Sequence, residues 1–140
     1  MANNPVQPKR IELLGQSAIN AGCMLSAPTD FGIGPIGEIH SPRYLRCLQT
    51  VFTCWQKSVN STGEVVPSSH PMSRNDSYPK STIGQAGFHQ ADTFCYISQH
   101  TWSSAYWSAQ SAINLTQHML DDAQYGYALC RPTGHHAFGE

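Results

Sequence analysis

The stretch YGYALCRPTGHH at residues 125–136 decides how the rest of the chain is interpreted. Its first half is a short apolar run, which is typical of a buried strand. Its second half is a turn in which a glycine precedes two adjacent histidines, His135 and His136. Ligands of an open α/β sheet bind outside the carboxyl ends of the strands. The stretch therefore predicts that both histidines lie at a site of chemistry just past the end of a strand.

Adjacent histidines have a specific chemical use near neutral pH. An imidazole titrates at about pH 6.5, so a pair can offer one neutral base and one cation at a single point. Such a pair suits the removal of a proton from water beside a developing negative charge. Tandem histidines also occur in loops without a function, and the two residues alone favour that interpretation. The residues around them reverse the preference.

Apolar residues recur at helical spacing in three stretches further from this motif. The first covers residues 8–20, and the second covers residues 41–55, where a Ser-Pro pair supplies an N-cap and a first-turn proline. The third begins at Thr101 and ends near Leu120, with one broad apolar stripe. These patterns predict three helices.

Between the helices lie segments that favour strands and loops. Residues 23–26 form a short apolar run before a proline, and they predict a second strand parallel to residues 125–130. Residues 60–87 are rich in Ser, Pro, Asn and Gly and predict a long loop or insertion, either functional or mobile. The order of helix, strand, helix, helix and strand predicts an α/β fold with a parallel sheet.

The composition of the 140 residues excludes several classes of protein. Only 12% of the residues are charged and the formal net charge is -1, so neither nucleic acid nor a charged surface is an expected partner. No apolar run approaches the roughly 18 residues of a membrane span, and we expect a cytoplasmic protein. Five cysteines without a Cys-x-x-Cys motif predict reduced, mostly buried thiols, with Cys47 and Cys54 both on the apolar side of one helix.

The residues around the twin histidines resemble a known family. The stretch ALCRPTGHHA at residues 128–137 resembles the histone deacetylase signature, a strand that ends in Arg-Pro-Pro-Gly-His-His-Ala, with Thr133 as the departure. Residues 84–88 (GQAGF), 91–93 (ADT) and 97–102 resemble the acetylpolyamine amidohydrolase branch of that family. The resemblance runs through nearly the whole chain, from about Pro5 to Glu140.

This resemblance implies a fold, a cofactor and roles for three residues. The implied fold is a partial arginase-like or deacetylase-like one, with three layers around a parallel sheet, and the intact family uses one catalytic zinc. His136 would be the general base and acid, and His135 would be its electrostatic partner. Asp92 would be the carboxylate at the pocket rim that orients the substrate, although a simple turn residue is an equally good interpretation.

Part of the family pattern is missing from the sequence. Family members bind zinc through an Asp-x-His pair after the twin-histidine loop and through a later Asp, and no Asp-x-His occurs among these residues. The oxyanion tyrosine of the family also belongs to a later portion. We therefore assign no metal ligand, and we expect no cofactor in this chain. Residues 1–140 are expected to be the N-terminal portion of a truncated deacetylase-like domain.

Two functions of different classes follow from these observations. The chain is either a fragment of a zinc-dependent amidohydrolase, inactive alone, or a non-catalytic homo-oligomeric module derived from that family. The substrate of the intact family would be an acetylated polyamine, acetyl-lysine or a related acylated amine. A low charge count and one-faced helices favour a homo-oligomer.

Overall fold

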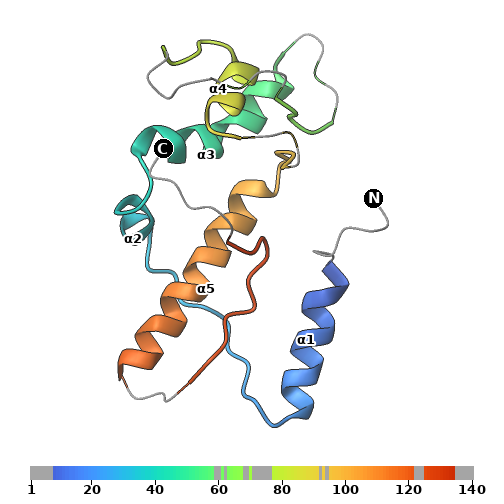
Figure 1. Cartoon of the computed structure of the whole chain (residues 1–140), viewed down its shortest axis with the longest axis vertical. Coiled ribbons are helices and arrows are strands. Elements are labelled where there is room, and N and C mark those ends of the chain that lie inside the picture. The colour runs from blue at the N-terminus through green and yellow to red at the C-terminus, as the bar shows by residue number, and fades with distance from the viewer. Residues whose placement is uncertain are drawn as a thin grey trace. The chain divides into compact units, whose positions relative to one another are not determined.

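The structure is a computed structural model, and it describes residues 8–58, 61, 63–67, 70, 77–91, 93, 95–121 and 125–134. This part of the chain contains the helices α1 (Pro8–Asn20), α2 (Gly34–Gly37), α3 (Pro42–Gln56), α4 (Thr82–Phe88) and α5 (Thr101–Asp121) (Figure 1). Contacts divide the chain into two compact units. Unit 1 comprises Met1–Pro35 and Ser103–Ala137, and unit 2 comprises Ile36–Trp102 and Phe138–Glu140.

The three predicted helices are confirmed as α1, α3 and α5. The N-cap of α3 is Ser41, whose hydroxyl oxygen accepts a hydrogen bond from the Tyr44 backbone N–H at 3.2 Å. The start of α5 is as predicted, and its end lies one residue beyond Leu120. The single-turn α2 and the short α4 were not predicted from the sequence.

The short helix α4 begins with a local cap at the end of the Ser/Pro/Asn-rich segment. The Ser81 hydroxyl oxygen accepts from the Gly84 backbone N–H at 3.1 Å. A Cβ atom on Gly84 would lie 2.7 Å from Pro79 Cβ and 2.8 Å from Ser81 Oγ, so this first turn has no room for a side chain. The Ser81 cap and Gly84, which is packed closely against Pro79 and Ser81, therefore define where α4 starts.

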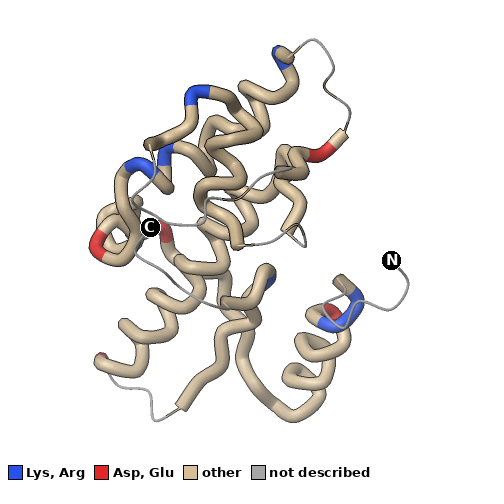
Figure 2. The backbone as a smooth tube through the Cα atoms, turned by 45° about the horizontal axis from the view of Figure 1, so that its top comes forward, with Lys and Arg blue, Asp and Glu red and all other residues tan. Residues whose placement is uncertain are grey.

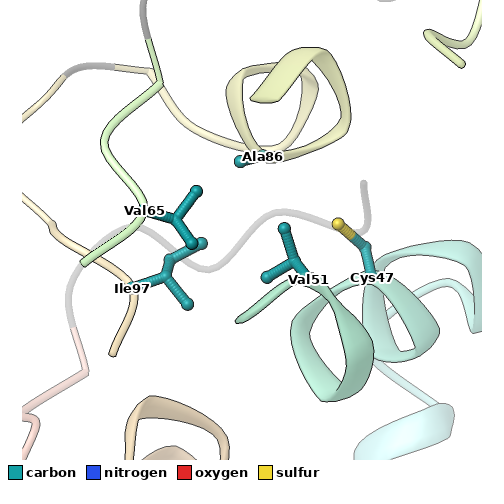
Figure 3. Close-up of a cluster of buried hydrophobic side chains, with 5 residues drawn as sticks. All are labelled: Cys47, Val51, Val65, Ala86 and Ile97. Carbon is teal, nitrogen blue, oxygen red and sulfur yellow. The ribbon is translucent and has the colours of Figure 1, made fainter. Parts of the chain in front are cut away.

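Unit 2 contains a cluster of buried apolar side chains (Figure 3). Val65 and Ile97 form an isolated antiparallel bridge, with backbone N–H to carbonyl distances of 2.8 and 3.0 Å. Side chains of α3 and α4 face this bridge. The cluster consists of Cys47, Val51, Val65, Ala86 and Ile97, with Phe52, Trp55 and Ile83 packed against it.

Unit 1 is organised around α5. The segment 125–134 runs beside α5 and between it and α1, and is drawn in red in Figure 1. Gly126 makes the closest approach, because a Cβ atom there would lie 2.3 Å from Leu115 Cδ1 on α5. On the other side, a Cβ atom on Gly15 of α1 would make an ordinary 3.8 Å contact with Leu129 Cδ1. A side chain at position 126 would therefore require the Leu115 side chain to move.

The two predicted strands are not formed in the described chain. Residues 23–26 and 125–130 have neither helix nor strand geometry, and the only β-bridge among the described residues is the one in unit 2. Parallel strands are stable when both faces of their sheet are covered. Here Met24 is 97% exposed and Tyr125 is 86% exposed, so that cover is missing.

The prediction that the cysteines are mostly buried is also wrong. Cys47 is buried and Cys130 is partly buried, but Cys23, Cys54 and Cys95 are exposed. On α3 the next position of the buried stripe after Val51 is taken by Trp55, which packs on the cluster and leaves Cys54 outside.

Within the described residues, no helix combines the length and the apolarity that crossing a membrane requires.

Candidate functional site

The three residues predicted to carry chemistry, His135, His136 and Asp92, lie outside the described residues. Their predicted roles therefore stay predictions. The structure does describe residues 125–134, which lead to the twin histidines, and the residues on both sides of Asp92. These two neighbourhoods belong to different units, and each has its own set of hydrogen bonds.

The residues that precede the twin histidines are hydrogen-bonded to α5 through one serine, Ser108. The Ser108 hydroxyl donates to the Pro132 carbonyl oxygen at 2.6 Å. The Cys130 thiol donates to the Ser108 carbonyl oxygen at 3.3 Å. Two bonds to one residue of a helix hold the backbone just before Gly134. Nothing in the sequence distinguishes Ser108 from the other serines of this helix.

A second set of α5 side chains holds the loop before α2. Gln110 is fully buried, and its side-chain oxygen accepts from the Phe31 backbone N–H at 2.9 Å. Its amide nitrogen donates to the Gly32 carbonyl oxygen at 2.9 Å. One turn further on, Asn114 Oδ1 accepts from the Thr29 backbone N–H at 3.2 Å. A buried glutamine with both amide atoms paired fixes this loop against the helix.

Asp30 belongs to the same loop and completes its attachment. The Tyr106 hydroxyl donates to Asp30 Oδ1, and the Gly32 backbone N–H donates to the same oxygen at 2.8 Å. The hydrogen bond from Tyr106, followed by the one from Gly32, lowers the pKa of Asp30 from its ordinary value of 3.8. The bond to Asp30 likewise raises the pKa of Tyr106. The pair is therefore most stable with Asp30 ionised and Tyr106 protonated.

The polar residues of α5 that bind the loop before α2 form a pattern that is visible in the sequence. Tyr106, Gln110 and Asn114 are four residues apart and so lie on one helix face. The stripe predicted for this helix included Tyr106 but neither Gln110 nor Asn114, and Leu120 at its end is exposed in the structure. Polar residues that repeat every four positions on an apolar helix indicate a face that binds another segment of backbone.

Described residues on the two sides of Asp92 are joined by a hydrogen bond. The Gln90 side-chain amide donates to the Cys95 carbonyl oxygen at 2.8 Å. Upstream, His70 Nδ1 lies 2.7 Å from the Gln90 carbonyl oxygen and 3.2 Å from that of Gly87. An Nδ1–H donating to these carbonyls ties residue 70 to the end of α4.

An aromatic cluster lies beside α4 in unit 2. The Tyr78 hydroxyl lies 3.2 Å from His89 Nε2, and the Arg43 guanidinium carbon is 5.0 Å from the centre of the Tyr78 ring. Burial raises the pKa of Tyr78 to about 12, and it also raises the pKa values of Tyr44 and Cys47. These groups stay protonated at neutral pH, so their contribution here is packing rather than base catalysis.

A metal-binding group is not found among the described residues. No set of three or more His, Cys, Asp or Glu side chains in that part of the chain is arranged to hold an ion. His135, His136 and Asp92 lie outside that part of the chain. A catalytic zinc needs three protein ligands and one open position. The described residues do not fit such a site.

The sequence of this chain, including the loop that contains the twin histidines, agrees with one protein family. The histone deacetylase domain family matches residues 4–140, and the chain belongs to this family. The predicted family resemblance is thereby confirmed.

Relatives similar to this chain include acetylpolyamine amidohydrolases. The enzyme of that name from Burkholderia pseudomallei (strain 1710b) is 40% identical over 130 residues, which are 93% of this chain and 38% of the relative. Acetylpolyamine amidohydrolase 1 from Pseudomonas aeruginosa is 37% identical over 117 residues, which are 81% of this chain and 34% of the relative. The chain thus spans little more than a third of these curated relatives.

The crystal structure of the acetylpolyamine aminohydrolase from Burkholderia pseudomallei has a similar fold. It matches with a TM-score of 0.85 and 38% identity, over 93% of this chain and 38% of that chain. The predicted deacetylase-like fold is therefore confirmed over the matched part, while no sheet is present among the residues that the structure of this chain describes.

Proposed function

We propose that this chain is the N-terminal part of an amidohydrolase that removes the acyl group from an acylated amine, and that it is inactive alone. The carrying observation is the family match over residues 4–140, which includes the twin-histidine motif. Within the proposal, His136 is the general base and acid and His135 is its electrostatic partner. Ser108 would support them by fixing the backbone at Pro132.

The proposed inactivity rests on the absent ligand set. The described residues do not fit a zinc site, and the sequence contains no Asp-x-His pair. The intact family is zinc-dependent, so the metal would need ligands from further protein. Without them the chain has a proton-transferring pair but no group that polarises the amide carbonyl.

The fold proposed for the complete domain is a three-layer α/β arrangement around a parallel sheet. Residues 23–26 and 125–130 would be two of its strands once other strands lie beside them. The supporting observations are the TM-score of 0.85 to the crystal structure and the position of residues 126–129 beside α5. Neighbouring strands would supply the ladder of backbone hydrogen bonds that makes a sheet.

The proposed substrate is an acylated amine. The relatives named acetylpolyamine amidohydrolases support this class. A polyamine is cationic and would be received best by several acidic side chains, yet residues 78–94 contain only one, Asp92. Acetyl-lysine or another acylated amine is therefore included in the proposal beside acetylated polyamines.

A non-catalytic homo-oligomeric module is the second candidate, and the exposed apolar side chains of unit 1 favour it. Met24, Leu120 and Tyr125 are 97%, 77% and 86% exposed. Light scattering separates the candidates, because a module forms a monodisperse dimer or larger assembly. A bare fragment is expected to be an aggregating monomer.

Metal analysis tests the catalytic proposal directly. We expect the purified chain, after dialysis against zinc-free buffer, to retain far less than one zinc per chain. The double variant His135→Ala/His136→Ala is the matched control and should retain as little as the unmodified chain. One tightly held zinc per unmodified chain, lost in the double variant, would overturn the proposed inactivity.

A further inference from the structure

An open pocket lies in unit 2. It is lined by Phe52 and Gln56 of α3, by residues 61, 63 and 64, and by residues 98–100, and its volume is about 480 Å³. All of these residues belong to the same unit. Sites for small molecules have volumes of about 300–1,000 Å³, so this pocket is large enough for a small ligand.

The antiparallel bridge between Val65 and Ile97 holds two walls of the pocket together. Its two backbone hydrogen bonds are 2.8 and 3.0 Å long, and both residues belong to the buried apolar cluster (Figure 3). In an antiparallel pair the residues that flank a bridge also lie opposite each other. The backbone of Glu64 is therefore placed across from that of Ser98 by a contact that is anchored in the core of unit 2.

Several hydrogen-bond donors of the pocket are used within the protein. The Gln99 side-chain amide donates to His100 Nε2 at 2.9 Å, and the Ser61 hydroxyl donates to the Gln56 carbonyl oxygen at 3.2 Å. The His100 backbone N–H donates to the Ser98 hydroxyl oxygen at 3.2 Å. An amide nitrogen can only donate, so His100 Nε2 is the acceptor. Oxygen atoms such as Gln99 Oε1 and Ser61 Oγ are left to accept from a ligand.

The charge of the pocket comes from Glu64. This side chain is exposed, and among the described residues its carboxylate has neither a hydrogen bond nor an ion pair. None of the lining residues is Lys or Arg. The other acidic residue in the described part of unit 2 is Glu38, and Figure 2 shows acidic residues as isolated red segments of the backbone. The pocket therefore favours a positively charged ligand.

We propose that this pocket binds a small organic cation, a primary ammonium group on a short alkyl chain. An ammonium group has three N–H donors and no acceptor, which complements a carboxylate and neutral oxygen atoms. Phe52 adds an aromatic side chain to the same lining, and aromatic rings attract cations and pack against alkyl groups. An anion would be repelled by Glu64, and an apolar ligand would desolvate the carboxylate without pairing it.

The proposal goes beyond the proposed hydrolysis, because binding at this pocket needs neither zinc nor the twin histidines. Failure of either proposal leaves the other unchanged. The expected affinity is modest, since Glu64 is exposed and an exposed ion pair is screened by salt. For 1,4-diaminobutane, with six non-hydrogen atoms, a dissociation constant of about 1 mM is the expected order.

Equilibrium dialysis of 1,4-diaminobutane against the purified chain at low salt tests the site, and NMR of the ¹⁵N-labelled chain locates it. We expect saturable binding that shifts the amide signals of residues 63–65 and 98–100. Succinate, a dianion with the same number of carbon atoms, should not bind. Glu64→Gln should weaken binding by about threefold or more. Glu38→Gln removes the same charge from the same unit outside the pocket lining and should leave binding unchanged.

Circular dichroism establishes that each variant has folded. If Glu64→Gln is unfolded, Gln99→Ala decides in its place, because it removes an exposed acceptor of the same pocket. Absence of saturable binding overturns the proposal, and so does equal weakening by Glu38→Gln, which would indicate general attraction of cations. Potassium ions that give the same shifts at the same concentration would also overturn it. Weakening by Asp92→Asn but not by Glu64→Gln would place the amine at the predicted substrate rim instead.

Discussion

Each of the two units of this chain is stabilised internally in a different way. Unit 2 has a cluster of buried apolar side chains, of which Val65 is fully buried and Val51 is 2% exposed. In unit 1, the fully buried side chain is the polar Gln110, and large apolar side chains such as Met24 and Tyr125 are exposed. Unit 2 therefore has an apolar core of its own, whereas the described segments of unit 1 are positioned by hydrogen bonds and several of its large apolar side chains are exposed.

The difference identifies unit 2 as the part of the chain that has its own cluster of buried apolar side chains. Burial of apolar surface is the main favourable term in folding, at about 25 cal/mol per Å². Unit 2 obtains it from its own residues. Unit 1 contains the approach to the twin histidines, and its missing cover is the structural reason to expect that the chemistry requires further protein. The following predictions test the comparison in order of expected effect.

The largest effect is expected in the core of unit 2. Ile97→Ala removes a side chain that is 4% exposed and leaves a cavity, which should lower the free energy of unfolding by about 2–5 kcal/mol. Val66→Ala is the control, because Val66 is adjacent to a core residue but 42% exposed. Urea unfolding followed by circular dichroism measures both. An Ile97→Ala variant as stable as Val66→Ala would show that the cluster is not a core.

The next effect concerns the buried glutamine of unit 1. Gln110→Ala leaves the Phe31 N–H and the Gly32 carbonyl without partners, at a cost of about 1–3 kcal/mol. Gln117→Ala is the matched control on the same helix, because Gln117 makes only an exposed bond to Asp121. Hydrogen exchange at residues 29–33 should accelerate in Gln110→Ala alone. Equal exchange in both variants would contradict the anchoring role.

The three long helices were predictable because their signals are local. The Ser41 cap, the proline behind it and the apolar spacing of α3 all lie within the helix or next to it. Gln110 was not predictable from such signals, because its partner Phe31 is 79 residues away in sequence. Strand formation at 23–26 and 125–130 likewise depends on neighbours that the sequence pattern does not contain.

The site was predictable as a motif but not as a geometry. The sequence identified His135, His136 and Asp92 through their resemblance to the family, and the family itself is confirmed. These three residues lie outside the part of the chain that the structure describes. Ser108 was missed because a serine on a helix has no pattern of its own, and its partner Pro132 is 24 residues further along the chain.

Two glycines of unit 1 provide a third test, with effects of opposite sign. Gly126→Ala places a methyl group against Leu115 Cδ1, so the Leu115 side chain must move, which should cost about 1 kcal/mol. Gly15→Ala adds an ordinary contact 3.8 Å from Leu129 inside a helix and should gain about 0.5–1 kcal/mol. Thermal unfolding compares them. A Gly126→Ala variant as stable as Gly15→Ala would contradict the close approach to α5.

The smallest effect is a pH dependence at Asp30. Its pKa is lowered in the folded chain, so its stabilising contribution is complete above the ordinary pKa of 3.8 and is lost as the pH falls through the folded value. Tyr106→Phe removes the largest cause and should move the pKa of Asp30 back toward 3.8. NMR titration of the carboxyl group measures this shift. An unchanged pKa in Tyr106→Phe would contradict the role of the tyrosine.

The most direct test of the proposed function is a hydrolysis assay on the purified 140-residue chain. An acetylated polyamine and an acetyl-lysine peptide are incubated with the chain, with and without added zinc, and released acetate is measured. The absent ligand set predicts release no faster than in a zinc-only control. Sustained zinc-dependent turnover that is abolished by His136→Ala would contradict it, because the chain would then assemble a complete site by itself.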